Sequence, residues 1–351
     1  MDLLGELELP LVHEVRALEE FLTGLWGKPL ADERGRWNPC HLPTNLQRHH
    51  LPLLAGAPTQ YMASLKADGA RTQLLLYQTA DLIPRAALFD RRLRYYQIPG
   101  LQAPPGLYAG TLLDGELVRT ATGPVLLLFD VLAYRGRARP SGASTRDALI
   151  TLATLVPTQL VGGPVHFEAK AFTPLANIRA LWADRARAPY PVDGLIVTPL
   201  AGNLPVLKHK EHCSVDVVLG QDRRLWYVAH DGRLEALDPA THGVELPAVF
   251  WESAPCGAVV EVNLYVVEGH LVGKLHRVRD DRPLPNSLRT VRRLLASAAE
   301  ALTIEEVLDA LVPPETAALR PLESLNPVAP ATGGTKGKGC PKEPGAIVGG
   351  G

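Results

Sequence analysis

The sequence predicts an α+β fold in which a domain of antiparallel sheets is followed by a small β-barrel. Three observations support this prediction. Short apolar runs separated by Gly, Pro and Asn recur through residues 61–133, which is typical of a strand meander. Helical patterns alternate with further strands between residues 144 and 198. After Cys213 the chain changes to short strands with hairpin turns at Asp231-Gly232 and Glu268-Gly269, a pattern typical of an oligonucleotide/oligosaccharide-binding (OB) barrel.

Length and composition limit the class of protein. The chain has 351 residues, enough for two domains with their own cores, and its net charge of −1 excludes a general nucleic-acid coat. Any RNA or DNA contact is therefore expected to be local. The cysteines lie far apart without a C-x-x-C pair, so we expect reduced thiols. No apolar run reaches the roughly 18 residues of a membrane span, and we expect a soluble, intracellular protein.

The first part of the chain is expected to contain a helix, an irregular segment and a meander. Apolar residues recur every three or four positions from Leu11 to Leu25, which predicts an amphipathic helix. Residues 27–60 are rich in proline, so we expect an ordered wrap without long regular elements. Strands are then predicted at 61–65, 73–77, 86–89, 91–98, 111–118 and 125–133.

The second part is expected to be mixed. Helices are predicted at 144–155 and 174–188, and strands at 166–172, 192–198, 204–210, 215–219, 225–229, 233–237, 258–267 and 271–276. Residues 302–311 read as a helix with Thr303 as its N-cap and Glu306 completing a capping box. The predicted units are residues 1–213, the barrel 214–300, a helix at 301–320 that packs back on the first unit, and a disordered tail at 321–351.

The segment Lys66–Arg71, with the sequence KADGAR, places an amine, a carboxylate and a guanidinium around one glycine. Its flanks are apolar enough to be buried strands, so we interpret it as the turn between two strands, with Gly69 providing backbone freedom. Lys66 would then lie at a strand end and face a cleft. Taken alone, the same motif is also compatible with a surface turn of solvated charges.

Other charged residues fall on predicted strands. Glu116 and Asp130 lie on or beside buried runs, where a carboxylate is costly unless it is paired or faces a cleft. Each is therefore either a salt-bridge partner or a site residue. Lys208 and Lys210 are two positions apart in an extended segment, so their ammonium groups project from one face. A solvated strand edge or a phosphate lying across that face would explain them.

Six motifs follow one another in order: KADGAR at 66, DGELV at 114, LLFDVLA at 127, DGLIV at 193, LKHK at 207 and R-x-D-R-x-x-P-N at 279. This series resembles the covalent nucleotidyltransferase superfamily and, within it, the GTP:RNA guanylyltransferases that cap messenger RNA. It is also similar to the single-domain capping enzymes of large DNA viruses. The resemblance covers residues 37 to 311. It implies an ATP-grasp-like, antiparallel-sheet nucleotidyltransferase domain followed by an OB-fold lid.

The resemblance also implies roles for single residues. Lys66 would attack the α-phosphorus of GTP, form lysyl-N-GMP and release pyrophosphate, with Mg²⁺ or Mn²⁺ as the divalent ion. The attacking amine must be neutral, and the neighbouring cations Arg71, Lys208 and Lys210 penalise its protonated form. The other family positions are Asp68 and Gly69 at the nucleotide, Glu116 and Asp193 in the nucleotide and metal region, Arg91 and Glu116 by the ribose, Phe129 on the base, Lys170 at the guanine edge, and Arg279, Asp281 and Arg282 in the lid that holds the leaving phosphates.

Two positions depart from the family pattern. Arg282 stands where the family usually has lysine, and its planar head changes the reach of the charge toward the phosphates. His209 stands where tryptophan is frequent, which is expected to affect packing more than charge.

The sequence therefore predicts a GTP:RNA guanylyltransferase that transfers GMP to the 5′-diphosphate end of RNA. An ATP-dependent DNA or RNA ligase and a catalytically inactive interaction module on the same scaffold are the alternatives. The length leaves no room for a triphosphatase or methyltransferase region, so an RNA triphosphatase and a cap methyltransferase are expected on other chains. RNA polymerase is a further candidate partner, and the nucleus or a cytoplasmic viral factory is the expected location.

Overall fold

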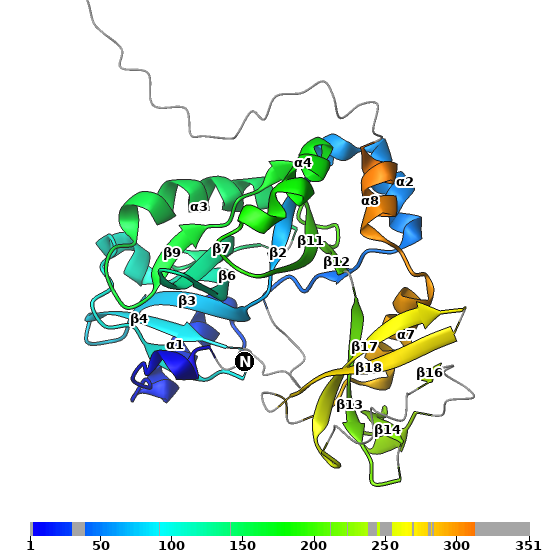
Figure 1. Cartoon of the computed structure of the whole chain (residues 1–351). Coiled ribbons are helices and arrows are strands. Elements are labelled where there is room, and N and C mark those ends of the chain that lie inside the picture. The colour runs from blue at the N-terminus through cyan, green and yellow to red at the C-terminus, as the bar shows by residue number, and fades with distance from the viewer. Residues whose placement is uncertain are drawn as a thin grey trace, which may run out of the picture.

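The computed structural model describes residues 3–29, 39–90, 92–140, 142–210, 212–222, 224–237, 244–245, 255–268, 270–279, 282 and 284–312. Within these residues the strands form three sheets, and the third, later sheet lies to one side of the first two (Figure 1). No helix among the described residues is both long and apolar enough to cross a membrane.

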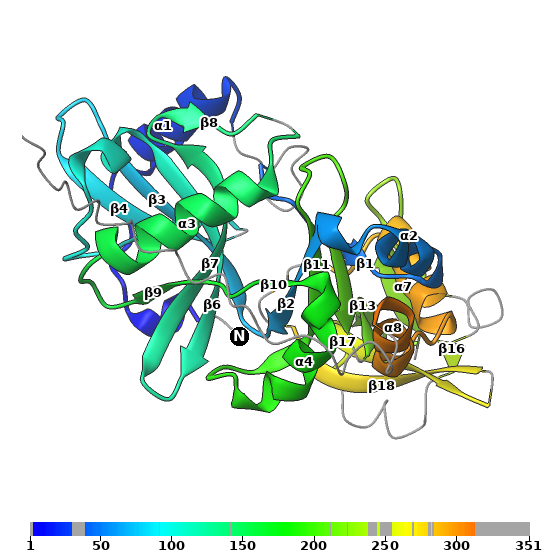
Figure 2. The ribbon, with the colours of Figure 1, turned by 90° about the horizontal axis from the view of Figure 1, so that it is seen from above.

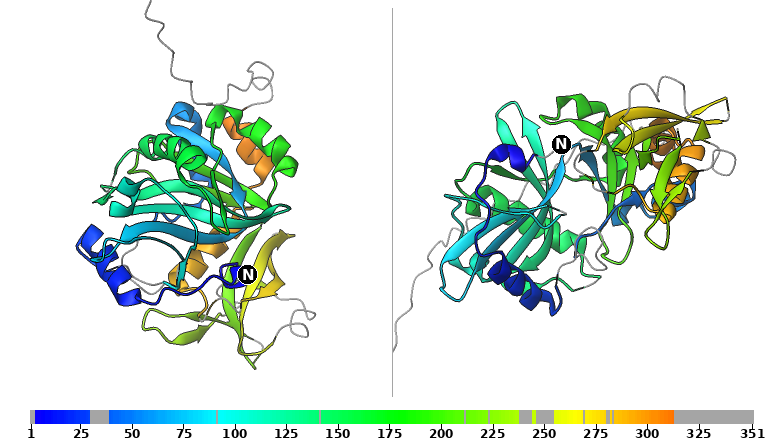
Figure 3. Two further views of the ribbon diagram at one scale, coloured as in Figure 1. Left: turned by 90° about the vertical axis from the view of Figure 1, so that its left-hand side faces the viewer. Right: turned by 90° about the horizontal axis from the view of Figure 1, so that it is seen from below.

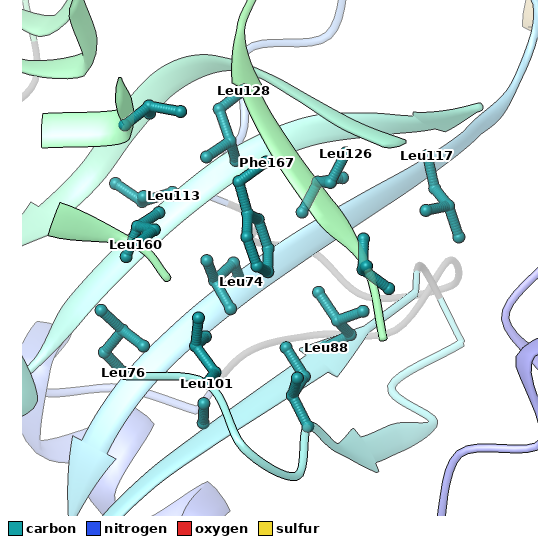
Figure 4. Packing of buried hydrophobic residues seen from close by; sticks show 14 of the residues in the cluster. Leu74, Leu76, Leu88, Leu101, Leu113, Leu117, Leu126, Leu128, Leu160 and Phe167 are labelled. Atoms are coloured by element: carbon teal, nitrogen blue, oxygen red, sulfur yellow. The ribbon is translucent and has the colours of Figure 1, made fainter. Parts of the chain in front are cut away.

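The largest sheet, here called the core sheet, has the strand order β5-β4-β3-β6-β7-β8, with β9 paired to β7. Its strands are β3 (Ala70–Gln78), β4 (Pro84–Phe89), β5 (Tyr95–Gln97), β6 (Thr111–Thr120), β7 (Gly123–Tyr134), β8 (Arg137–Ala138) and β9 (His166–Ala169). The leucines of one face pack under Phe167 and the helix α3 (Thr145–Gln159), which lies across this face (Figures 2 and 4). The opposite face packs against α1 (Val15–Trp26) through Leu18 and Leu22. Burial on both faces explains why these strands are nearly continuous apolar runs.

The second sheet carries Lys66 and has the order β1-β12-β11-β2-β10. Its strands are β1 (Thr44–Asn45), β2 (Tyr61–Ala67), β10 (Thr173–Pro174), β11 (Val192–Pro199) and β12 (Leu207–Lys210). One face is covered by the short helices α2 (Leu51–Gly56), α4 (Ile178–Ala183) and α8 (Ile304–Leu311), which share one apolar cluster with it. The remaining short turns of helix are η1 (Gly5–Leu7), η2 (Arg48–His50), η3 (Pro58–Gln60), η4 (Pro105–Ala109), η5 (Leu175–Asn177) and η6 (Asp184–Arg187).

The third sheet has the order β15-β14-β13-β17-β18-β16 and begins directly after β12. Its strands are β13 (Cys213–Leu219), β14 (Leu225–Val228), β15 (Leu234–Ala236), β16 (Val244–Glu245), β17 (Val259–Val267) and β18 (His270–Val278). Helix α7 (Leu288–Ala299) packs on this sheet through Val291 and Leu295, and Figure 3 shows the sheet below the first two. The predicted α+β class, with mainly antiparallel sheets followed by a later sheet of short strands, is confirmed. The OB type of that later unit remains a prediction.

The chain returns from the third sheet to the second through α8. Thr303 accepts a hydrogen bond from the backbone N–H of Glu306, and the Glu306 carboxylate accepts one from the N–H of Thr303 at 2.8 Å. Val307 and Leu308 of this helix are buried against α2, α4 and β11. The predicted capping box is therefore confirmed. The unit boundaries at 213 and 300 remain predictions, and the predicted tail lies outside the described residues.

Removing the cap should destabilise the protein measurably. We expect Thr303→Ala to lower the free energy of unfolding by about 1 kcal/mol, because one orphan N–H of the first turn loses its acceptor. Urea unfolding followed by circular dichroism measures this change. Thr303→Ser keeps the hydroxyl and should lie close to the unchanged chain; a Ser variant as unstable as the Ala variant would contradict the role of the cap.

Several boundaries differ from the predictions. The strand expected at 91–98 is reduced to β5, since Asp90 folds the preceding residues into a turn by accepting hydrogen bonds from the N–H groups of Arg92 and Arg94. In the described part of residues 27–60 the regular elements are short, as expected, and α2 has Pro52 in its first turn, where the missing N–H is tolerated. Helix α7 was not predicted, although Ser287 caps it by accepting from the N–H of Thr290.

Candidate active site

The KADG turn carries the chain from the second sheet to the core sheet. Strand β2 ends at Ala67 and β3 begins at Ala70, but β2 pairs with β10 and β11 whereas β3 pairs with β4 and β6. Gly69 packs so closely on β6 that a Cβ atom would lie 2.3 Å from the carbonyl oxygen of Leu117. The glycine is therefore required for close approach of two backbones, and it places Lys66 between the sheets.

A cleft of about 520 Å³ opens at this turn, a volume within the range of small-molecule sites. The second sheet contributes Ser64, Lys66, Asp193, Lys208 and Lys210; the core sheet contributes Arg71, Glu116 and Phe129; Lys170 follows β9; and the third sheet side contributes Arg277, Arg279 and Arg282. The cleft thus gathers most of the charged positions that the motifs singled out.

Lys66 lies in an ion pair at the centre of the cleft. Its Nζ donates to both carboxylate oxygens of Asp193, at 2.6 and 2.8 Å. Lys210 Nζ lies 3.1 Å from one of these oxygens, so one carboxylate bridges two amines from different strands. Gly194, with a φ of +151°, allows this arrangement, since a Cβ atom there would lie 2.0 Å from the carbonyl oxygen of His209.

The lysines of β12 alternate with buried residues. Leu207 and His209 point into the apolar side, and Lys208 and Lys210 line the cleft. His209 is buried, and its Nε2 lies 2.9 Å from the carbonyl oxygen of Leu302, in the segment that returns to α8. His209 thus connects β12 to the segment that precedes α8.

Arg71 lines the cleft but is held by a buried carboxylate. Its side chain is 7% exposed and pairs with Asp114, which is completely buried. Arg71 Nε donates to Asp114 at 3.1 Å, and Gln73 Nε2 donates to the same carboxylate at 2.9 Å. Burial opposes the charge of Arg71, but the attraction of Asp114 outweighs this effect and raises the pKa of the guanidinium above its ordinary value. Asp114 thus fixes Arg71 at the cleft from behind, without lining the cleft itself.

Lys170 lies over an aromatic ring. Its Nζ is 5.5 Å from the centroid of the Phe129 ring, and its backbone N–H donates to the carbonyl of Leu128 at 2.8 Å. Burial lowers the pKa of Lys170 to about 8, against the opposing attraction of Glu116. A ring and an amine with this geometry can stack on a planar base and donate a hydrogen bond to its edge.

The arginines contributed by the third sheet side are paired with carboxylates. Arg279 donates to Asp216 at 3.0 Å and to Glu261 at 3.3 Å, and Arg282 lies 2.8 Å from Asp216. Burial opposes the charge of Glu261, but a hydrogen bond from Ser214 and the adjacent arginines lower the pKa of Glu261 to about 2. These pairs hold the guanidinium groups at the wall of the cleft.

A family model described as mRNA capping enzyme, catalytic domain, matches residues 28–211, just over half of the chain. The chain belongs to this family. The resemblance seen in the six motifs is confirmed at this level.

Two solved structures show distant similarity to this capping-family chain. The ATP-dependent DNA ligase from bacteriophage T7 in complex with ATP has a TM-score of 0.32 and 14% identity, covering 67% of this chain and 98% of the ligase chain. The structure named Pmar-Lig_PreS3 has a TM-score of 0.32 and 12% identity, covering 68% of this chain and 67% of its own.

The two carboxylates that the sequence left open both line the cleft. Asp130 is also a salt-bridge partner, since it pairs with Arg139 and lies 3.5 Å from His41. Glu116 lies opposite Arg71 in the β3–β6 register and lines the cleft. Two residues expected from the capping-family motifs, Arg91 and Asp281, lie outside the described residues.

Sequence reasoning missed several cleft residues of this capping-family chain. Ser64 is completely buried in the cleft wall, and its hydroxyl has no hydrogen-bond partner within the described part of the chain. Ser64 could have been predicted as a cleft residue from its spacing, because residues two apart on a strand share a face and Lys66 faces the cleft. Asp114 was quoted within a motif, but its pairing with Arg71 was not predicted, because nothing in the local pattern indicates the partner.

Proposed function

We propose that this chain is a GTP:RNA guanylyltransferase that forms lysyl-N-GMP on Lys66 and transfers GMP to the 5′-diphosphate end of RNA. The observation that supports this most strongly is the Lys66 amine in a cleft beside Asp193, Lys208 and Lys210. Membership of the capping family provides the reaction class.

The first step would form a bond between Lys66 Nζ and the α-phosphorus and break the bond from that phosphorus to the bridging oxygen of pyrophosphate. Asp193, at 2.6 Å from Nζ, is the nearest acceptor for the proton that the amine must lose. Lys208 and Lys210 would bind the triphosphate oxygens and stabilise the charge that develops on the leaving group. Because Lys66 and Lys210 share the Asp193 carboxylate, the attacking amine and a phosphate-binding amine belong to one hydrogen-bond network.

Glu116 and Asp193 would hold the divalent ion, Mg²⁺ or Mn²⁺. Among the described residues no group of three or more His, Cys, Asp or Glu side chains forms a closed site. Carboxylate oxygens with substrate phosphates are the set that Mg²⁺ prefers, so the two cleft carboxylates fit such an ion. When bound, the ion supplies neutralisation of phosphate charge.

In this proposal Phe129 and Lys170 discriminate guanine from adenine. Guanine presents two acceptors, O6 and N7, on one edge, whereas adenine presents a donor and an acceptor there. The ammonium of Lys170 is donor-only, so it favours guanine. This observation favours GTP over the ATP that a ligase would use.

Covalent labelling tests the proposal. The protein is incubated with α-³²P-labelled GTP or ATP and a divalent ion without RNA, then separated by denaturing electrophoresis. We expect label from GTP, and release of that label to a 5′-diphosphate RNA as a capped end. Label from ATP alone would favour the ligase alternative, and no label from either nucleotide would favour the inactive module.

The other capping steps are proposed to come from separate chains. An RNA triphosphatase would supply the 5′-diphosphate RNA, and a cap methyltransferase would use the product. RNA polymerase is proposed as a further partner.

The affinity for GTP should fall as the pH rises through the pKa of Lys170. The folded-state pKa is about 8, lowered from 10.5, so the ammonium donor is present below this pH and is lost above it. We expect the dissociation constant for GTP to rise by up to tenfold per pH unit above about pH 8. Calorimetric titration of the Lys66→Ala variant measures binding without chemistry. Lys170→Arg keeps its charge and should show a flat profile; a sloping one would contradict the assignment.

A further inference from the structure

The outer rim of the cleft carries arginines that none of the six motifs contains. Arg92 and Arg94 lie in the loop after β4, and Arg119 lies near the end of β6; all three line the cleft. Arg277 of β18 lines it from the third sheet. Cations on two sides of an open cleft, beyond the nucleotide positions, indicate a second anionic ligand.

The strand register places the core-sheet arginines at the same end of the sheet as Lys66. Phe89, the last residue of β4, pairs with Gln73, so the following loop runs toward the KADG turn. On the other side of β3, Ala70 pairs with Leu117, two residues before Arg119. Since β4 and β6 flank β3, the loop and the strand end lie on opposite sides of β3 at the KADG end of the core sheet. Arg92 and Arg119 therefore border the cleft mouth on two sides.

The β4–β5 loop is held in a fixed shape. Asp90 accepts hydrogen bonds from the backbone N–H groups of Arg92 and Arg94, at 2.9 and 3.1 Å, and from the side chain of Arg94 at 2.8 Å. The Arg94 side chain therefore stabilises the loop. Arg92 has no salt bridge with any residue that the structure describes, and it lines the cleft, where a ligand can reach it.

Arg119 and Arg277 are in ion pairs that an anionic ligand can replace. Arg119 pairs with Glu6 at the surface, with side chains 61% and 44% exposed. Arg277 is 41% exposed and lies 2.8 Å from Glu261. The Arg119–Glu6 pair is exposed and contributes little to stability, so exchanging its carboxylate for a phosphate oxygen is inexpensive. Glu261 is buried, but it keeps Arg279 and Ser214 as partners when Arg277 turns to a ligand.

We propose that Arg92 and Arg119, with Arg277 across the cleft, bind the sugar-phosphate backbone of the acceptor RNA next to its 5′-diphosphate. This inference rests on the proposed function. In the transfer step the terminal phosphate oxygen of the RNA forms a bond to the phosphorus of lysyl-N-GMP, the P–N bond breaks, and Lys66 takes up a proton. In-line displacement puts the attacking oxygen opposite the Lys66 nitrogen, so the RNA enters through the open mouth that these arginines flank. Phosphate contacts carry no sequence information, which suits an acceptor of any sequence.

The experiment measures transfer and binding separately. Isolated enzyme-GMP is mixed with a 5′-diphosphate RNA of ten nucleotides under single-turnover conditions, and binding of the same RNA is followed by fluorescence anisotropy with protein that carries no GMP. For Arg92→Ala/Arg119→Ala we expect the half-saturating RNA concentration and the dissociation constant to rise about tenfold. The slope of log affinity against log salt should fall by about 1.4, or 0.7 per lost phosphate contact.

Two further variants control the result. Arg16→Ala removes an exposed arginine that also pairs with a glutamate, Glu20, but lies on α1, and it should change neither quantity. Glu6→Gln releases Arg119 and should tighten RNA binding about twofold to threefold. Circular dichroism checks that each variant is folded.

Equal RNA binding, transfer and salt slope in the double variant and the unchanged chain would overturn the inference, and the rim would be a solvated, charge-paired surface. If RNA binding weakens as expected in the double variant but the unchanged protein forms no GMP adduct, the RNA surface stands and the proposed function fails.

Discussion

Lys66→Ala is expected to reduce covalent labelling by GTP to the background of the assay. The reaction needs an amine that can reach the α-phosphorus, and Lys66 provides it at the end of β2, where the Gly69 turn holds it between the sheets. No remaining contact can replace a covalent bond, so the loss should be complete rather than partial. Lys66→Arg should be equally inactive, because a guanidinium does not lose its proton.

Lys170 is the control for this prediction, because it is another amine of the cleft and its pKa is lowered. Its pKa of about 8 makes part of it neutral near physiological pH. Lys170→Ala should still be labelled, at higher GTP concentration, since the base contact is lost and the nucleophile is kept. Peptide mapping of the adduct locates the label directly. A labelled Lys66→Ala variant together with an unlabelled Lys170→Ala variant would reassign the nucleophile to Lys170.

Arg71→Ala is expected to lower the free energy of unfolding by about 3–5 kcal/mol, because it leaves the buried Asp114 carboxylate without its cation. The sequence interpretation makes this arginine a cation that acts on the Lys66 amine, but in the structure its guanidinium donates to Asp114 and to the carbonyl of His41. Urea unfolding measures the loss. The adduct yield of Arg71→Ala should fall only in proportion to its loss of folded protein.

The double variant Arg71→Met/Asp114→Leu separates the two roles. Replacing both partners by apolar residues removes the unpaired charge, so most of the stability should return. If Arg71→Ala unfolds like the unchanged chain yet forms little adduct, the guanidinium acts on the nucleotide and the structural interpretation is wrong.

The residues of the candidate site could be predicted from the sequence better than the arrangement of the sheets. The KADG, DG and LKHK motifs singled out Lys66, Asp193 and Lys210, which the structure places at one cleft, and the period of two along β12 grouped Lys208 with Lys210 on its cleft side. Local patterns do not show that β2 and β3 belong to different sheets, because both strands are apolar runs and pairing depends on distant β10, β11, β4 and β6.

The sequence also did not predict which charged residues pair with one another. Glu116 and Asp130 both line the cleft, but the sequence did not indicate that Asp130 pairs with Arg139, which comes from beyond β8. Arg92 also gave no signal, since its position depends on the turn that Asp90 forms. Helix α7 was missed because its many charged and small residues obscured an apolar stripe that includes Val291 and Leu295.

The return of the chain to α8 also sets an order of events during synthesis. The face of the second sheet that contains Leu195 and Val197 is covered in part by Val307 and Leu308, which are made about a hundred residues after β12. At translation rates of roughly 5–20 residues per second, that apolar face waits on the order of 5–20 s for its cover. The third sheet, whose core comes from residues 213–298, can form during this wait. A nascent chain that stalls in this interval would therefore present a complete third sheet beside a second sheet with an exposed apolar face, which is the state most open to chaperone binding or aggregation.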